Sequence, residues 1–133
     1  LDWIISSLKN SLPMRNNITY VLSLLLLMTG CVQKTYKKTV VFELDVSQLK
    51  NIETVGIRGD DQPLNWDNST PMTAIKKDTT YTVTATFVTG YKFTEVKFTV
   101  NDEFELKGKD NRRINFSEKD TTYYKAIFDK AEQ

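Results

Sequence analysis

The stretch that decides the fold is Glu95-Val96-Lys97-Phe98-Thr99-Val100-Asn101-Asp102-Glu103-Phe104-Glu105-Leu106. Val96, Phe98 and Val100 alternate with polar residues, which is the period-two pattern of a strand with one buried face. Asn101 and Asp102 follow, and both residue types tolerate the positive φ of a tight hairpin turn. The stretch therefore predicts a β-hairpin.

The number of residues in this turn decides where one aromatic ring lies. A two-residue turn places Thr99 opposite Phe104 and Lys97 opposite Leu106, on the face away from the buried valines. A three-residue loop instead pairs Val100 with Phe104, and the phenyl ring then belongs to the core. The spacing alone leaves both alternatives open.

The rest of the chain contains further short strand patterns separated by turn formers. They span residues 39–46, 54–58, 79–87, 112–116 and 121–128. Such spacing predicts an all-β fold, an immunoglobulin-like antiparallel β-sandwich of about seven strands over residues 39–129, with residues 130–133 as a tail. We expect Met72 and Ile75 to plug the core beneath a long loop over residues 59–71.

Composition excludes several classes of site. The chain has 133 residues, no His and one Cys, which excludes His-based acid–base chemistry, Cys/His zinc sites and an internal disulfide. Without residues 1–31, 16 basic and 16 acidic side chains remain. A nucleic-acid partner is not expected, because such proteins usually carry a basic excess.

Residues 1–30 have the pattern of an export signal. Met14 is a plausible translation start, Arg15 supplies a positive charge, and an apolar run extends over residues 18–28. The stretch Leu27-Met28-Thr29-Gly30-Cys31 resembles the lipobox of bacterial lipoproteins. That resemblance implies cleavage before Cys31, lipid on this residue, and a membrane anchor. The alternative is an uncleaved helix with an ordinary cysteine.

The residues after the cysteine bear on localisation. Residues 31–38 are interpreted as the lipidated cysteine and a short polar tether. Val32 is not an aspartate, so inner-membrane retention is not signalled. We expect an outer-membrane lipoprotein of the cell envelope, facing either the periplasm or the cell surface.

The sequence does not predict an enzyme or a cofactor. No Ser lies in a Gly-flanked nucleophile elbow, and the hydroxyls belong mostly to threonines in strands. Acidic residues occur as Asp60/Asp61 and as Asp102/Glu103/Glu105. Such groups could make an acid–base pair or a Ca²⁺ site, but they are interpreted as solvated turn acids. Asp60, Asp61 and Asp67 lack the spacing of a dedicated calcium loop, so no metal site is predicted.

Trp66 is the most informative single residue. It lies in a loop rich in polar residues, where an exposed indole can stack on the apolar face of a sugar while polar neighbours bind the hydroxyls. The alternative is that Trp66 caps the open end of the sandwich.

Three short motifs give the chain a family resemblance. They are Gly56-Ile57-Arg58-Gly59, Asn65-Trp66-Asp67 and Pro71-Met72-Thr73. Together with the hairpin Lys97-Phe98-Thr99-Val100-Asn101-Asp102-Glu103-Phe104, they resemble starch- and glycogen-binding modules of carbohydrate-binding families 20 and 48. The resemblance covers most of residues 39–128.

The resemblance implies carbohydrate-binding residues. Trp66 and Phe104 correspond to the two stacking aromatics of the family, and Lys97 to its sugar-bonding lysine. The chain departs from the pattern where Phe104 replaces a tryptophan and Asp102 replaces the turn glycine. The loop before Trp66 is also longer and more acidic than is usual in the family.

Two functions are predicted from this sequence. The first is a non-catalytic lipoprotein that binds an α-glucan or a related glycan, with possible protein partners in a glycan-utilisation system. The second is a protein-interaction or structural envelope lipoprotein that uses the same sandwich without binding sugar. Fold alone does not separate the two.

Overall fold

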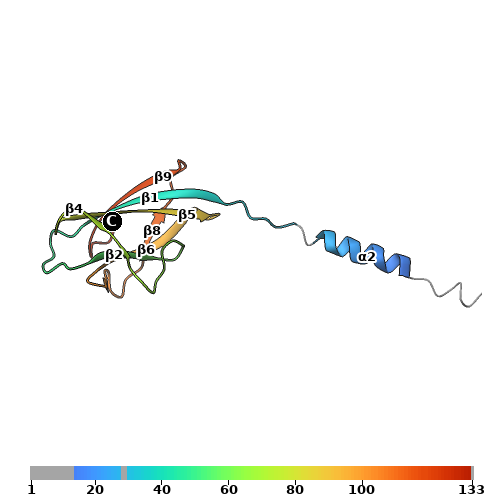
Figure 1. The fold of residues 1–133 in the computed structure, drawn as a ribbon, viewed down its shortest axis with the longest axis horizontal. Coiled ribbons are helices and arrows are strands. Elements are labelled where there is room, and N and C mark those ends of the chain that lie inside the picture. Colours follow the sequence, from blue (N-terminus) through green and yellow to red (C-terminus); the bar gives the residue numbers. More distant parts are fainter. Residues whose placement is uncertain (1–13, 28–29, 133) are drawn as a thin grey trace, which may run out of the picture. The chain divides into compact units, whose positions relative to one another are not determined.

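The computed structural model describes residues 14–27 and 30–132 of the chain. This part contains one helix, α2 (Met14–Leu27), and nine strands. The strands form two sheets in separate layers, which confirms the predicted all-β sandwich (Figure 1). Residues Lys34–Gln133 form a compact unit by themselves. The buried apolar core lies entirely within residues 40–114, so we expect the sandwich to fold without the segment that precedes it.

The signal region is only partly described. Residues 1–13 and the lipobox residues Met28 and Thr29 lie outside the described residues, whereas Cys31 is described and exposed. Within the described ranges, no helix combines the length and the apolar character needed to cross a membrane.

The first sheet, called sheet A here, is built around β1 (Tyr36–Asp45). The strand order is β4 (Thr73–Lys76), β5 (Thr80–Thr89), β1 and β9 (Thr121–Ile127). β1 is antiparallel to β5 and parallel to β9. Val40, Phe42 and Leu44 are fully buried, because alternate side chains of this strand face the second sheet. The strand begins at Tyr36, three residues before the predicted start.

The second sheet, called sheet B here, is built around β6 (Phe93–Val100). β2 (Val55–Gly59) pairs with one edge of β6, and β3 (Thr70–Pro71) pairs with β2. β7 (Glu103–Phe104) pairs with the C-terminal end of β6, and β8 (Arg112–Asn115) pairs with its N-terminal half. The predicted hairpin, residues 95–106, thus contains the strand with which β2, β7 and β8 all pair.

The core lies between the two sheets. Phe42 of sheet A meets Phe98 of sheet B edge to face, with ring centroids 6.1 Å apart. Met72 is buried as predicted, but the prediction for Ile75 is wrong, since this side chain is 61% exposed. Ile75 belongs to β4, a short strand at the edge of sheet A whose residues are all exposed.

The hairpin turn has two residues. Asn101 and Asp102 both have positive φ, 52° and 60°, and Thr99 pairs with Phe104. The core-facing alternative for Phe104 is therefore wrong. The expected pairing of Lys97 with Leu106 does not form, because β7 ends at Phe104. Leu106 instead has a φ of 48° and is buried.

Substitution by glycine is expected to change the stability of the fold in opposite directions at the two turn residues. At residue 102, glycine removes the cost of a positive φ and loses only an exposed ion pair with Arg58 at 3.9 Å, so Asp102→Gly is expected to stabilise the fold by up to about 1 kcal/mol. At residue 101 it removes a side chain whose Oδ1 accepts hydrogen bonds from the amides of Glu53 and Thr54, at 2.7 and 3.1 Å. Asn101→Gly is therefore expected to destabilise by at least about 1 kcal/mol. Urea unfolding of both variants tests this, and equal effects would contradict it.

Candidate functional site

Strand register brings charged and aromatic side chains together on the outer face of sheet B. Arg58 on β2 pairs with Lys97 on β6, and Thr99 on β6 pairs with Phe104 on β7. Each of these residues alternates with buried neighbours such as Ile57 and Phe98. The face away from the core therefore carries a guanidinium group, an ammonium group and a phenyl ring.

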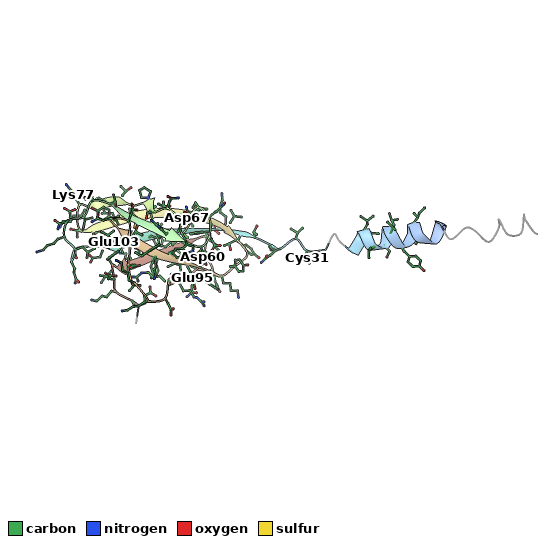
Figure 2. The ribbon with its side chains drawn as sticks, turned by 90° about the horizontal axis from the view of Figure 1, so that it is seen from below. Cys31, Asp60, Asp67, Lys77, Glu95 and Glu103 are labelled. Atoms are coloured by element: carbon green, nitrogen blue, oxygen red, sulfur yellow. The ribbon has the colours of Figure 1, made fainter. Side chains whose placement is uncertain are left out.

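The loop over residues 60–69 places Trp66 above this face. The indole Nε1 of Trp66 donates a hydrogen bond of 2.7 Å to Oδ1 of Asp60, and its carbonyl accepts one of 2.9 Å from Nη1 of Arg58. Leu64 anchors the loop by inserting into the core, where it is 2% exposed. The amide of Asp60 donates to the carbonyl of Glu95 at 3.0 Å, and the two side chains are labelled close together in Figure 2. The tryptophan is thus held at both its backbone and its ring.

The two aromatic rings form a bent platform. The ring centroids of Trp66 and Phe104 are 6.2 Å apart, and the ring planes are inclined by 54°. Both side chains are half-buried, so each keeps exposed ring surface. The guanidinium of Arg58 lies 4.9 Å from the Phe104 centroid, a cation–π contact that supports the ring.

A shallow depression adjoins this platform. We call it the platform pocket. It has a volume of about 360 Å³ and is lined by Trp66, Lys97, Phe104, Lys107, Gly108 and Asn111. The structure thus brings all three sequence-predicted residues, Trp66, Lys97 and Phe104, to one exposed place. Apolar ring surface lies there beside amine and amide donors.

Lys97 also has a structural role at the pocket. Its Nζ donates to the carbonyls of Leu106 and Lys109, at 3.1 and 2.9 Å, and so holds the loop that forms one wall. An ammonium group has three N–H donors. The third has no acceptor among the described residues and is available to a ligand.

Three residues of the site were not predicted as site residues from the sequence. Arg58 donates to the backbone carbonyl of Trp66 and lies against the Phe104 ring, while Lys107 and Asn111 line the pocket. Arg58 was recognisable as an outward residue, but its position opposite Lys97 depends on the pairing of β2 with β6. Lys107 and Asn111 reach the pocket through the irregular chain between β7 and β8, which no periodic pattern predicts.

A buried ion pair lies beneath the platform. Glu105 is fully buried, and its carboxylate accepts hydrogen bonds of 2.6 and 2.8 Å from Nε and Nη2 of Arg112. The interpretation of Glu105 as a solvated turn acid is therefore wrong. The two-residue turn places it on the core face opposite Phe98, whose amide also donates to it at 3.1 Å.

The pKa values of Arg112 and Tyr124 are both raised, for different reasons. Burial acts to lower the pKa of Arg112, but the hydrogen bonds and charge of Glu105 outweigh burial and raise it. Burial, together with a hydrogen bond to Glu132, raises the pKa of the neighbouring Tyr124 to about 12. Near pH 7, Arg112 therefore stays charged and Tyr124 stays neutral.

The side chains of Asp60 and Asp61 also have structural partners. Asp60 holds the Trp66 indole, and Oδ2 of Asp61 accepts a hydrogen bond of 2.7 Å from the hydroxyl of buried Thr94. Within residues 14–27 and 30–132, no three His, Cys, Asp or Glu side chains converge as a metal site would require.

Neither a known protein-family model nor a curated protein sequence matches this chain.

Proposed function

We propose that this sandwich is a non-catalytic module that binds an α-glucan or a related glycan at the platform pocket. The observation that carries the proposal is the convergence of Trp66 and Phe104, each with exposed ring surface, beside Lys97, Lys107 and Asn111. Aromatic faces stack on the C–H face of a sugar, and neighbouring donors bind its hydroxyls. Both requirements are met within one depression.

The shape of the pocket favours a segment of a chain as the ligand. A volume of about 360 Å³ is near the small end of ligand sites, so the pocket holds part of a glycan and leaves both ends free. The 54° angle between the rings suits a chain that curves, as α-linked glucans do. An extended β-1,4-linked chain is flat and fits this bend less well.

The proposal includes a membrane anchor. We propose that Cys31, which is exposed, carries the lipid that the lipobox resemblance implies, and that the module acts at the cell envelope. The described residues 32–35 between this cysteine and β1 have no regular secondary structure and provide a short tether.

Isothermal titration of residues 31–133 with maltoheptaose tests the proposal. Weak binding is expected, and Trp66→Ala is expected to reduce affinity about 30-fold or more, because truncation of a central aromatic contact costs about 2 kcal/mol. Trp66→Phe keeps a stacking ring and should retain most of the affinity. Cellohexaose, which has the flat chain, should bind more weakly than maltoheptaose.

A matched control tests whether the loss of affinity is specific to Trp66 or follows from the loss of any exposed aromatic ring. Tyr123 is 76% exposed on β9 of sheet A, and Tyr123→Ala should leave the affinity unchanged. Thermal unfolding of each variant checks that the fold is intact. If no glucan binds, or if Trp66→Ala binds as tightly as the wild type, the glycan proposal is wrong. Protein partners lost in that variant would then support the interaction-module alternative.

A further inference from the structure

A second and larger concave surface lies where β1 enters the sandwich. We call it the tether-end surface. Its volume is about 730 Å³, and its lining includes Tyr36, Lys37, Tyr91, Lys92, Glu118 and Asp120. β6 starts beside it at Phe93 and ends at the hairpin turn. The hairpin turn therefore lies at the far end of this strand from the tether-end surface, and the platform pocket lies between them, at the level of Lys97 and Phe104.

Two exposed tyrosines mark this surface. Tyr36 is 50% exposed and Tyr91 is 65% exposed, while half-buried Phe116 lines the surface beside them and packs against Phe87. A tyrosine at a membrane–water interface buries its ring and keeps its hydroxyl hydrated. Exposed tyrosines around a concave surface are therefore suited to the headgroup region of a bilayer.

Positive charge is concentrated at the same end of the sandwich. Lys37 and Lys92 line the surface, and their ammonium groups form no ion pair within the described residues. Lys38 donates to the carbonyls of residues 117–119, so its charge is fixed at the rim. With Lys34 and Lys119 nearby in the chain, five lysines oppose Glu118 and Asp120. The local net charge is +3, whereas the whole chain has +1.

The covalent chain limits how far this surface can lie from an anchor at Cys31. Tyr36 follows Cys31 by five residues, which span at most about 18 Å when fully extended. An anchored domain is thus presented to the bilayer at a high effective concentration, so even weak headgroup contacts can hold it there.

We propose that the tether-end surface docks on anionic phospholipid headgroups of the membrane that holds Cys31. Tyr36 and Tyr91 enter the interface, and Lys37 and Lys92 bind lipid phosphates. Docking keeps the hairpin end of β6, with the platform nearby, directed away from the bilayer. The inference rests on anchoring at residue 31 and is independent of what the platform pocket binds.

Nanodiscs with a spin-labelled lipid headgroup provide the test. Residues 31–133 are coupled through Cys31, the only cysteine of the chain, to a maleimide lipid, so that the anchor is supplied chemically. In discs with phosphatidylglycerol, amide NMR signals of residues 90–92 and 116–120 are expected to broaden strongly. Signals of residues 76–78 and 101–102, at the other end of the sandwich, should stay sharp. Discs of pure phosphatidylcholine should show much weaker selective broadening.

Charge reversal tests whether Lys37 and Lys92 bind the lipid headgroups. Lys37→Glu/Lys92→Glu should lower the docking equilibrium constant at least about 25-fold, since each surface lysine contributes about fivefold. The matched control Lys76→Glu/Lys77→Glu makes the same charge change at the opposite end of β5, where Thr80 pairs with Asp45. Figure 2 labels Lys77 at that end. The control should dock like the wild type.

Three results would overturn the proposal. They are equal broadening at both ends of the sandwich, the same broadening in neutral and anionic discs, and wild-type docking of the Lys37→Glu/Lys92→Glu variant. Amide spectra recorded without discs verify that every variant is folded.

Discussion

Replacement of Arg112 by methionine is expected to destabilise the sandwich by about 3–5 kcal/mol, because it leaves the Glu105 carboxylate buried without a countercharge. The side chains of Glu105 and Arg112 are 0% and 3% exposed, so water does not replace the lost partner. A domain of about 100 residues loses about 4–8 °C in Tm per kcal/mol. The predicted change in Tm is therefore more than about 12 °C, which heat unfolding measures directly.

The effect is large because the ion pair links separate parts of the chain. Nη2 of Arg112 also donates to the carbonyls of Ile127 and Lys130, at 3.0 and 2.8 Å. Glu105 additionally accepts from the amides of Phe98 and Asp129, at 3.1 Å each. Loss of Arg112 thus frees the chain after β9 as well as the end of β7, next to Phe104. We expect the glycan affinity of the variant to fall together with its stability.

Two controls make this prediction specific. Arg113, the next residue, has a side chain that is 59% exposed and lies 3.9 Å from a Glu95 oxygen. The substitution Arg113→Met should therefore lower the stability by less than about 1 kcal/mol. The double variant Glu105→Gln/Arg112→Met removes both charges and keeps a side-chain acceptor. It should recover much of the lost stability. A cost below about 1 kcal/mol for Arg112→Met alone would contradict this account of the ion pair.

Replacement of Phe42 by alanine is expected to cost about 3–5 kcal/mol. Phe42 is fully buried on β1 and makes edge-to-face contacts with Phe98 and Tyr124, each with centroids 6.1 Å apart. The contact with Phe98 crosses between the sheets, so its loss leaves a cavity in the middle of the sandwich. The free energy of unfolding from urea titration measures the change.

Val41 provides the matched control for this substitution. It is the next residue of β1, lies on the outer face of sheet A and is only half-buried. Val41→Ala should cost less than about 1 kcal/mol, because the site stays open to water and no cavity forms. Similar losses at residues 41 and 42 would mean that the core does not lie where the structure places it.

The hairpin shows how much of the structure can be predicted from the local sequence pattern. The alternation before Asn101 and the two turn formers were sufficient to predict the strand and the turn. They left the turn length open, and the side-chain contacts that hold the observed turn are long-range. The Asn101 side chain accepts from Glu53 and Thr54, almost 50 residues earlier in the chain.

Glu105 shows where a local interpretation fails. A glutamate near a polar turn is usually solvated, and no pattern around it indicates burial. Its partner Arg112 becomes a neighbour only when β7 and β8 pair with the same strand, β6. One signal was available, since Arg112 is in phase with buried Ile114 on β8. An arginine on the core face requires a buried acid.

The strands β3 and β4 were missed for a different reason. β4 is an edge strand whose residues are all exposed, so it has no alternation between buried and polar side chains. β3 has two residues, one of them Pro71, and proline is disfavoured in strands. Ile75 was assigned to the core because it is apolar. In the structure it points outward from the edge of sheet A.

The candidate site was predictable in its residue types more than in its geometry. Trp66, Lys97 and Phe104 were proposed from short motifs, and the structure places them around one pocket. The supports of the site were not predictable, because they depend on how the loop over residues 60–69 folds back. Asp60 orients the indole, and Arg58 bonds the backbone carbonyl of Trp66, only in that folded arrangement.

Amide chemical-shift mapping of residues 31–133 during titration with maltoheptaose is the most direct test of the central claim, which is glycan binding at the platform. The proposal predicts progressive shifts confined to residues 65–68 and 103–111, together with the Trp66 indole N–H signal. These shifts should be absent in Trp66→Ala. No shift at saturating ligand, or shifts confined to the tether-end surface, would contradict the claim.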